Sequence, residues 1–298
     1  MFKPIEFPSG PATLRGRFYS HGPGLRPTVV MAHGTSATIT MAIDAYAEAF
    51  HTAGYDVLLY DHAGFGISGG IPRQEINPWV QARGIRDAVA FLRAQDESRE
   101  VILWGDSYSG MIVLVAGALI PDVAAIIAQI PACGPALPDC AASDDALAAL
   151  GRILAEGDVS GSEAERVGPL PVVSADQINA PSLLQPIQAF RWFIEYGGRH
   201  GSRWQNQATR MIPATEVPFH PILTAPYLTM PTLVMVGQDD EMVHCNPAVQ
   251  RAVYDALAGP RDWMDIPGGH FGLIWHPGPI FDQAVAGQLA FLRGHVAP

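Results

Sequence analysis

The sequence predicts an α/β fold built on a mostly parallel, doubly wound sheet. Short runs of apolar and β-branched residues alternate with longer segments of helical period along most of the chain, which is typical of parallel strands joined by helices. The expected strands are TVVMAH (28–33), DVLLYD (56–61), VILWG (101–105), AAIIAQI (124–130), TLVMVG (232–237) and DWMDI (262–266). Two further features complete the prediction, namely a hairpin before these strands and one long segment that interrupts the alternation.

The segment before the first parallel strand is expected to form an antiparallel hairpin. Residues 5–20, IEFPSGPATLRGRFYS, place a Pro-Ser-Gly-Pro group between two extended stretches. Such a group favours a tight turn, because proline fixes its φ angle and glycine accepts a positive one. An antiparallel hairpin therefore precedes the parallel part of the fold.

Helices are expected between the strands. The segment 78–95 repeats apolar residues at about the spacing of one helix face, namely Val80, Ile85, Val89, Phe91 and Leu92. The other expected helices cover residues 41–53, 111–119, 247–258 and 280–293. The sequence contains no internal repeat.

Residues 132–217 break the alternation of strands and helices. They are rich in proline, glycine and alanine, and they show helical patches without a convincing strand. We interpret them as a helical cap inserted into an α/β core formed by residues 1–131 and 218–298. Trp192 and Tyr196 of this cap are candidates for the roof of an apolar substrate pocket, whereas packing of the cap onto the core is the simpler explanation for most of its aromatic residues.

Composition limits the classes of partner. The chain has 298 residues with 48% hydrophobic content, enough for one large core. Its 29 acidic and 18 basic residues give a formal charge of -11, which repels nucleic acid and anionic lipid. The first residues lack the pattern of a secretory signal, and no uncharged apolar run reaches the about 18 residues of a membrane span. We therefore expect a cytoplasmic protein that acts on a small molecule and binds neither nucleic acid nor membrane.

Nothing in the sequence indicates a metal or an organic cofactor. Cys133, Cys140 and Cys245 are too few and too scattered for a disulfide framework or a zinc site, so free thiols are expected. No His-x-x-x-His pair occurs, and the glycines of GFGISGG follow a strand without opening a clear helix, which argues against a dinucleotide site. The oligomeric state is not indicated.

A candidate nucleophile lies in WGDSYSG (104–110), between an expected strand and an apolar helix. A sharp strand-to-helix turn brings the residues two before and two after its apex close together, so both must be small. Around Ser107 these residues are Gly105 and Ser109. With Ser109 at the apex, Met111 would clash. Sterics therefore favour Ser107 as the nucleophile, and the alternative is an ordinary strand-to-helix turn.

A serine hydroxyl needs a base to accept its proton and a third group to orient that base. The candidate base is His270 in PGGHFG, which follows the last expected strand, because two glycines there allow the chain to bend back toward the sheet. His244 and His276 are competitors, but His244 lies within an acidic loop and His276 precedes a Pro-Gly-Pro turn.

The orienting carboxylate is expected in VMVGQDDEMV (234–243). Asp239, Asp240 and Glu241 follow a strand there, and the carboxyl ends of parallel strands meet at the edge where Ser107 also emerges. The residues themselves do not distinguish among these three acids.

Two backbone N–H groups are candidates for binding the charge that develops on a carbonyl oxygen. One belongs to Tyr108, the residue after the serine. The other belongs to Thr35 in VVMAHGTSAT, because Gly34 allows the chain to turn this N–H toward the pocket. A tight turn alone would need the same glycine.

The order Ser107, Asp240, His270 and the stretches GDSYSG, HG and DHAGFGISGG resemble the α/β-hydrolase superfamily over nearly the whole chain. This resemblance favours Asp240 as the acid, since the family acid usually lies three residues after the glycine that ends its strand. It also implies that residues 61–68 shape a loop beside the site. The stretches PRQEINPWVQARGIRDAVAFL and LWGDSYSGMIVLVAGAL are similar to a peptidase-like and dienelactone-hydrolase-like branch, which includes hydrolases and acyl transferases of natural-product pathways.

The chain departs from the family pattern in two places. Ser109 stands where glycine is most common, and the loop reads HGTS rather than the HGGG of some lipases, which argues against a lipase. A serine at the apex also argues against the aspartate-dependent dehalogenases and epoxide hydrolases, and against a cysteine-dependent dienelactone hydrolase.

The resemblance implies a serine hydrolase that cleaves an ester, thioester or amide of a small organic molecule through an acyl-enzyme and needs no cofactor. An acyl transferase or a carboxylate-eliminating lyase would use the same residues, and a binding protein without turnover would keep the same pocket. The cap also carries a local positive charge that would attract a carboxylate-bearing substrate or form a solvated face. It arises from Arg191, Arg199, Arg203 and Arg210 against Glu195.

Overall fold

The computed structural model describes residues 1–298 apart from 23, 25, 98 and 157–164. Its centre is a sheet with the strand order β1-β2-β4-β3-β6-β7-β10-β11. These strands are β1 (Phe2–Ser9), β2 (Ala12–Tyr19), β3 (Thr28–Ala32), β4 (Asp56–Tyr60), β6 (Val101–Asp106), β7 (Val123–Gln129), β10 (Thr232–Gly237) and β11 (Arg261–Ile266). The strands from β4 to β11 are parallel, whereas β2 is antiparallel to both β1 and β4. The predicted parallel sheet with an N-terminal hairpin is confirmed.

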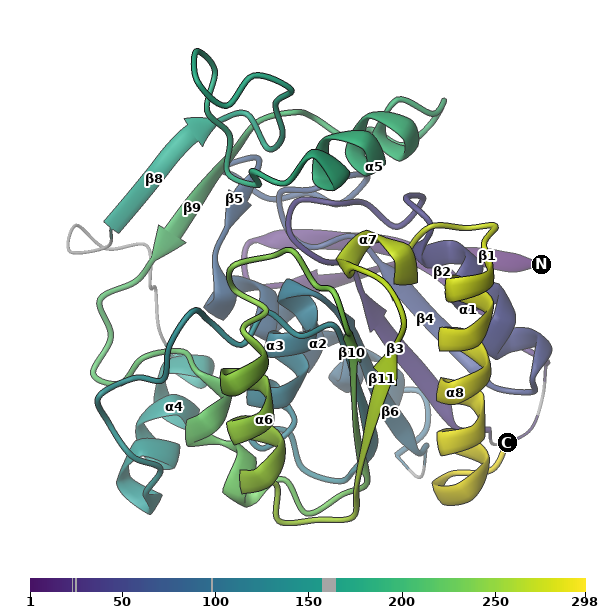
Figure 1. Cartoon of the computed structure of the whole chain (residues 1–298). Coiled ribbons are helices and arrows are strands. Elements are labelled where there is room, and N and C mark those ends of the chain that lie inside the picture. Colours follow the sequence, from purple (N-terminus) through teal and green to yellow (C-terminus); the bar gives the residue numbers. More distant parts are fainter. Residues whose placement is uncertain (23, 25, 98, 157–164) are drawn as a thin grey trace.

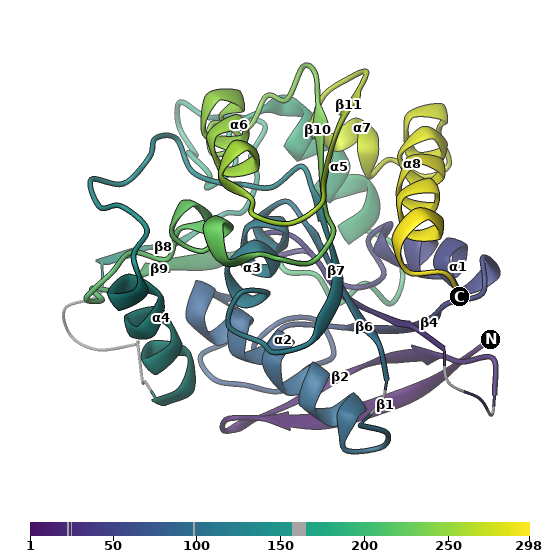
Figure 2. The ribbon, with the colours of Figure 1, turned by 90° about the horizontal axis from the view of Figure 1, so that it is seen from below.

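Helices cover both faces of the sheet (Figures 1 and 2). Alternate residues of a strand point to opposite faces, so Val29 and Met31 of β3 join one core, and Val30 and Ala32 join the other. The first core includes α1 (Ile43–Thr52) and α8 (Pro279–His295). The second includes α2 (Pro78–Arg93), α3 (Tyr108–Ala116) and α6 (Pro247–Ala256). Burial on both faces explains why the parallel strands are almost entirely apolar.

Asparagine-proline pairs define where two of the helices begin. The side chain of Asn77 accepts a hydrogen bond from the Trp79 N–H at the start of α2, and Asn246 accepts one from the Ala248 N–H at the start of α6. Proline follows each asparagine, where its missing N–H has no cost. The helix expected at 111–119 begins earlier, at Tyr108, because the chain passes from strand to helix within a single residue.

The segment 132–217 differs from the predicted helical cap, because it contains strands. Besides α4 (Asp144–Glu156) and α5 (Ile187–Gly197), it holds β8 (Glu165–Leu170) and β9 (Ala208–Ile212). These pair with β5 (Glu75–Ile76) in a second sheet of order β5-β9-β8. The Gly-Pro pair in β8 and the register shift after Val167 remove the alternation by which a strand is predicted.

The two helices of this segment take different positions. The α4 helix lies beside α2, where the Arg83 and Arg86 side chains donate hydrogen bonds to the Leu154 carbonyl near the C-terminus of α4. By contrast, α5 lies over the carboxyl end of the central sheet together with β8 and β9 (Figure 1). Trp192 and Tyr196 attach α5 to the body, since their side chains donate hydrogen bonds to the carbonyls of Ile274 (2.8 Å) and His276 (2.8 Å).

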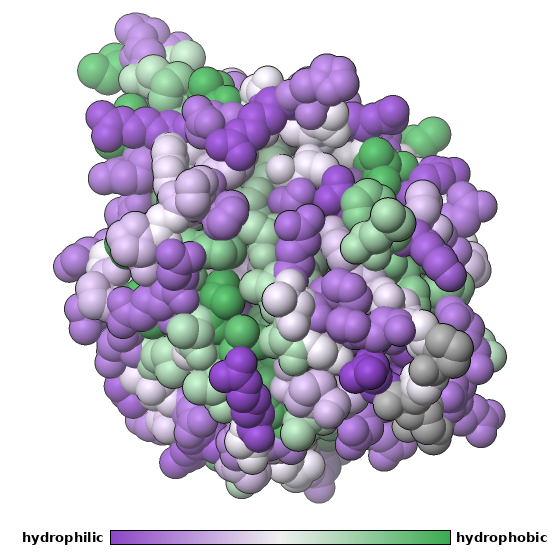
Figure 3. All heavy atoms as spheres, turned by 90° about the vertical axis from the view of Figure 1, so that its right-hand side faces the viewer, coloured by the Kyte–Doolittle hydropathy of each residue, from purple (hydrophilic) through white to green (hydrophobic). Residues whose placement is uncertain are grey.

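The remaining elements are short. They are α7 (His270–Leu273) and the 3₁₀ turns η1 (Pro221–Leu223) and η2 (Ala225–Tyr227). Within the part of the chain that the structure describes, no helix is long and apolar enough to cross a membrane. On the face in Figure 3, hydrophilic side chains predominate, and the hydrophobic ones form small patches between them.

A substitution at Gly16 tests the packing where the N-terminal hairpin joins the parallel sheet. It pairs with Tyr60 on β4, and a Cβ at this position would overlap the Leu59 carbonyl. Gly16→Ala should therefore lower the free energy of unfolding by about 1–3 kcal/mol, measured by urea denaturation.

Gly294→Ala in α8 is the matched control, because a Cβ there meets open space. Alanine should be neutral or stabilising at this position through its higher helix propensity, by at most about 1 kcal/mol. An unfolding midpoint of Gly16→Ala equal to that of the wild type would contradict this account of the junction.

Candidate active site

Ser107 occupies the single-residue turn between β6 and α3. Its backbone has φ 53° and ψ -113°, a conformation that non-glycine residues rarely adopt. A Cβ at Gly105 would overlap the Ser109 carbonyl, so the residues on either side of the turn approach as closely as the sequence predicts. The turn directs the Ser107 side chain into a pocket at the carboxyl end of the sheet.

Ser109 has a different role from Ser107. Its side chain is fully buried, donates a hydrogen bond to the His33 carbonyl (2.6 Å) and lies 2.9 Å from Nε2 of His62. This hydroxyl therefore connects the turn to the ends of β3 and β4. Ser107 is the serine of the WGDSYSG stretch that reaches the pocket.

Ser107, His270 and Asp240 lie in line. The Ser107 Oγ is 3.0 Å from Nε2 of His270, and the other ring nitrogen, Nδ1, is 2.8 Å from Oδ2 of Asp240. His270 is the first residue of α7, and Asp240 lies in the turn after β10. The structure thus brings the three residues together, and of the three neighbouring acids it is Asp240 that contacts the ring.

The other histidine and acid candidates lie elsewhere. Asp239 is exposed, and Glu241 accepts a hydrogen bond from the backbone N–H of His270 (2.8 Å) instead of contacting the ring. His244 is 3.2 Å from the Arg210 guanidinium. His276 uses its backbone N–H and carbonyl to bind the Tyr196 hydroxyl.

The charges around His270 stabilise its protonated form. Burial, the largest single effect, would lower its pKa, but it is outweighed by the combined effects of the Asp240 carboxylate, which also accepts its hydrogen bond, and of Asp106 and Glu241. The pKa of His270 is therefore raised above its ordinary value. This direction suits a group that must hold a proton briefly beside a reacting serine.

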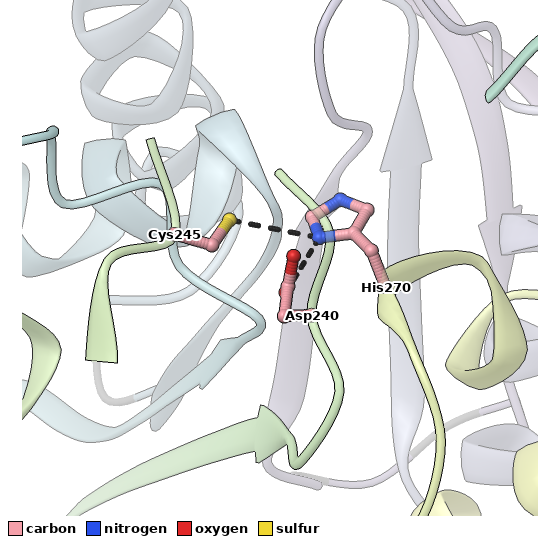
Figure 4. A group of neighbouring side chains, drawn as sticks. All are labelled: Asp240, Cys245 and His270. Carbon is pink, nitrogen blue, oxygen red and sulfur yellow. Dashed lines mark hydrogen bonds and ion pairs between the residues drawn. The ribbon is translucent and has the colours of Figure 1, made fainter. Parts of the chain in front are cut away.

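Cys245 also contacts His270, although no sequence pattern indicates that it belongs to the site. Its Sγ is 3.6 Å from Nδ1. Figure 4 shows the Cys245 and Asp240 side chains directed toward this ring nitrogen. Burial, followed by the nearby carboxylates, raises the pKa of the thiol well above its ordinary value. Asp240, Cys245 and His270 offer ligand atoms within 4.8 Å of one another. A metal there would compete with the hydrogen bond that orients His270, and the absence of a metal stays a prediction.

A small pocket surrounds Ser107 and His270. Its polar lining comes from Gly34, Thr35, Asp106, Ser107 and His270. Its apolar lining comes from Ala37, Leu184, Trp192, Phe193, Met242, Phe271 and Ile274. The cap thus contributes hydrophobic walls through three of these residues.

Of the remaining predicted site residues, three lie at the pocket or next to Ser107, and one, Tyr196, does not. Thr35 lines the pocket beside Ser107, and Tyr108 is the first residue of α3, where a backbone N–H has no acceptor within the helix. Trp192 also lines the pocket. Tyr196 is not among the lining residues, because its hydroxyl is directed at the backbone of His276, so the prediction that it binds substrate is not supported.

The four cap arginines do not line this pocket within the described residues. Arg199 pairs with Glu195 (2.7 Å) and Arg210 contacts His244, whereas Arg191 lines a separate surface pocket.

Asp106 is a residue of the site that sequence reasoning missed. It lies next to the nucleophile, is 3% exposed and lines the pocket. Burial raises its pKa to about 6, against the opposing effects of His270 and of a hydrogen bond from Gln129. An acid directly before the apex serine was the available signal.

Comparisons place this fold among known proteins. The family model described as serine aminopeptidase, S33, matches residues 24–264. The chain is 28% identical over 300 residues to the thiohydrolase aneE of Aspergillus aculeatus, covering 95% of this chain and 90% of that protein. It is 28% identical over 313 residues to the polyketide transferase af380 of Aspergillus fumigatus, covering 98% of each. The solved α/β-hydrolase GrgF from Penicillium sp. shares the fold, with a TM-score of 0.72 and 22% identity over the whole of both chains.

The charges around His270 give a testable pH dependence. Below the pKa of His270 the ring is protonated and cannot accept a proton from Ser107, so kcat/KM should fall as the pH falls through this raised pKa. Glu241→Gln removes one charge that raises the pKa, so the acid limb of the kcat/KM profile should move to lower pH while the plateau is retained.

Asp239→Asn is the control, because this neighbouring acid is exposed and is not among the groups that raise the pKa of His270. Its acid limb should coincide with that of the wild type. A limb that moves equally in both variants, or toward higher pH in Glu241→Gln, would refute the assignment of this limb to His270.

Proposed function

We propose that this chain, which belongs to the serine aminopeptidase (S33) family of α/β-hydrolases, hydrolyses an ester or thioester of a small organic acid through an acyl-enzyme on Ser107. The observation that supports the proposal is that the His270 ring contacts both other residues: Nε2 is 3.0 Å from the Ser107 Oγ, and Nδ1 is 2.8 Å from Oδ2 of Asp240. A serine hydroxyl is activated when a base is positioned to accept its proton and an acid is positioned to orient that base.

In the first half of the reaction, His270 Nε2 accepts the Ser107 proton while Oγ attacks the carbonyl carbon of the substrate. The N–H groups of Thr35 and Tyr108 are proposed to stabilise the oxyanion. Asp240 holds the ring in the correct tautomer and stabilises the imidazolium. His270 then protonates the leaving alcohol or thiol, and the acyl group remains on Ser107.

In the second half, water replaces the leaving group. His270 accepts a proton from water, the hydroxide attacks the acyl-enzyme, and the acid is released as Ser107 regains its proton. Thioesters belong beside esters in this proposal, because a relative that covers nearly the whole chain is named a thiohydrolase. An amide is the more demanding substrate, since its amine must be protonated before it leaves.

A second candidate function is transfer of the acyl group to an acceptor other than water. The apolar walls from Leu184, Trp192 and Phe193 favour it, because a site that excludes water lengthens the life of an acyl-enzyme. The relative named a polyketide transferase covers 98% of this chain. Added alcohol, amine or thiol acceptors would then increase turnover and divert the acyl group from the free acid.

Ser107→Ala and Ser109→Ala test the proposal as a matched pair within one turn. Removing the proposed nucleophile should reduce kcat/KM for p-nitrophenyl esters and for acyl thioesters of N-acetylcysteamine by at least about 10³-fold. Ser109→Ala should keep most of this activity and lose about 1–3 kcal/mol of stability, because it leaves the His33 carbonyl and His62 without their partner.

Circular dichroism and urea denaturation of both variants show whether a loss of activity reflects unfolding. Full turnover by folded Ser107→Ala, on every substrate that the wild type cleaves, would disprove the acyl-enzyme. A wild type without turnover on any ester or thioester, with or without acceptors, would favour a binding protein.

A further inference from the structure

Asp106 lines the pocket, and only one of its two carboxyl oxygens has a hydrogen-bond partner within the described residues. Oδ1 accepts a hydrogen bond from Nε2 of Gln129 (3.0 Å). Oδ2 has no hydrogen-bond partner within the described part of the chain, although the residue is only 3% exposed and lines the pocket. The side chain therefore has an unused acceptor in the wall of the pocket.

A directional chain of buried hydrogen bonds fixes this orientation. It begins at the indole of Trp104, which can only donate, and whose Nε1 donates to Oε1 of Gln288 (2.7 Å). Gln288 must then turn its amide nitrogen to Oε1 of Gln129, and Gln129 must turn its own nitrogen to Asp106. Because the Trp104 indole can only donate, each later hydrogen bond of the series has a fixed donor. Oδ1 of Asp106 therefore accepts an N–H from Gln129, and Oδ2 is the free oxygen.

The free oxygen lies beside the nucleophile. A Cβ built on Gly34 would be 3.1 Å from Oδ2 of Asp106 and 3.0 Å from the Ser107 Cβ. Both groups thus lie against Gly34, in the loop that carries Thr35. The carboxyl group of Asp106 and the base of the Ser107 side chain are therefore neighbours in the pocket wall, and the first carbons of an acyl group on Ser107 would be the part of a substrate nearest to Asp106.

An acceptor that loses water without gaining another partner is costly, and a carboxylate is more costly than a neutral oxygen, so a substrate that fills the pocket must supply a donor to Oδ2. The pocket offers little to satisfy it, because Ser107 and His270 are hydrogen-bonded to each other and most of the remaining walls are apolar. Above the pKa of about 6 the carboxyl is ionised, so it can only accept hydrogen bonds. The missing donor must come from whatever enters the pocket.

We propose that Asp106 recognises a hydroxyl group on the α or β carbon of the acyl group, and that the preferred substrates are hydroxyacyl esters or thioesters. This inference rests on the proposed function, because it assumes that an acyl group reaches Ser107. It adds a specificity residue to the site and assigns Gln129, Gln288 and Trp104 to its positioning.

The test compares N-acetylcysteamine thioesters that differ by one oxygen, namely butyryl, α-hydroxybutyryl and β-hydroxybutyryl, at pH 8. The wild type should show a kcat/KM for one hydroxyacyl isomer that is about tenfold or more above that for butyryl, as expected for a hydrogen bond to a charged acceptor. Asp106→Ala should bring this ratio close to one.

Asp106→Asn should reverse the preference, because the direction of the hydrogen bonds from Trp104 to position 106 is fixed. Gln129 donates to the asparagine oxygen, so the NH₂ group takes the place of Oδ2 and offers a donor instead of an acceptor. This variant should favour acetoacetyl, which carries a carbonyl acceptor on the β carbon, over butyryl. Met242→Leu, which changes the shape of the same pocket without changing its polarity, should leave the wild-type ratios in place.

Ratios near one in the wild type, or a hydroxyacyl preference that Asp106→Ala retains, would overturn the inference; in the first case a water molecule would be the partner of Oδ2. The proposed function is tested independently of this inference. If butyryl turnover depends on Ser107 while the hydroxyacyl ratio stays at one, the acyl-enzyme stands and the role of Asp106 falls.

Discussion

The site depends on the backbone of Ser107, which passes from strand to helix with a positive φ angle. This turn costs conformational energy, and it is retained because its surroundings leave no alternative: Gly105 and Ser109 touch across it, and the Ser109 hydroxyl ties it to β3 and β4. The parallel sheet then fixes what the serine meets. Since β6, β10 and β11 run in the same direction, their carboxyl ends deliver Ser107, Asp240 and His270 to one edge.

Electrostatics at this edge follow from burial. The apolar walls remove water from His270 and Asp240, which would disfavour a lone charge, but the pair is hydrogen-bonded and the imidazolium is surrounded by carboxylates. In the same mostly apolar environment, the free oxygen of Asp106 has few groups that could donate a hydrogen bond to it. Family membership and the pocket have different uses: the family places the chain among the α/β-hydrolases, and the polar atoms of this particular pocket are the basis of the proposed preference for one kind of acyl group.

Much of the fold could be predicted, because its signals are local. Buried parallel strands are uninterrupted apolar runs, and residues 78–95 repeat apolar side chains at the spacing of one helix face, so these elements were correctly placed. The strands of the cap were missed because Gly168-Pro169 breaks the β8 pattern and its partner β5 is only two residues long. Steric reasoning selected Ser107, whereas Asp240 was favoured over its neighbours by family resemblance alone. Tyr196 and Cys245 could not be assigned correctly, because their partners His276 and His270 are distant in sequence and meet them only in the folded chain. Asp106 could be noticed as the acid before the serine, but the contact with Gln129 that orients it appears only in the fold.

The most direct measurement is the site of covalent modification by a fluorophosphonate, determined by mass spectrometry of the digested protein. The account predicts that a single phosphonate lies on the peptide that contains Ser107, that Ser107→Ala abolishes this labelling, and that His270→Ala slows it strongly, because the reagent requires an activated hydroxyl. Labelling of another residue, or a rate that does not depend on His270, would contradict the account.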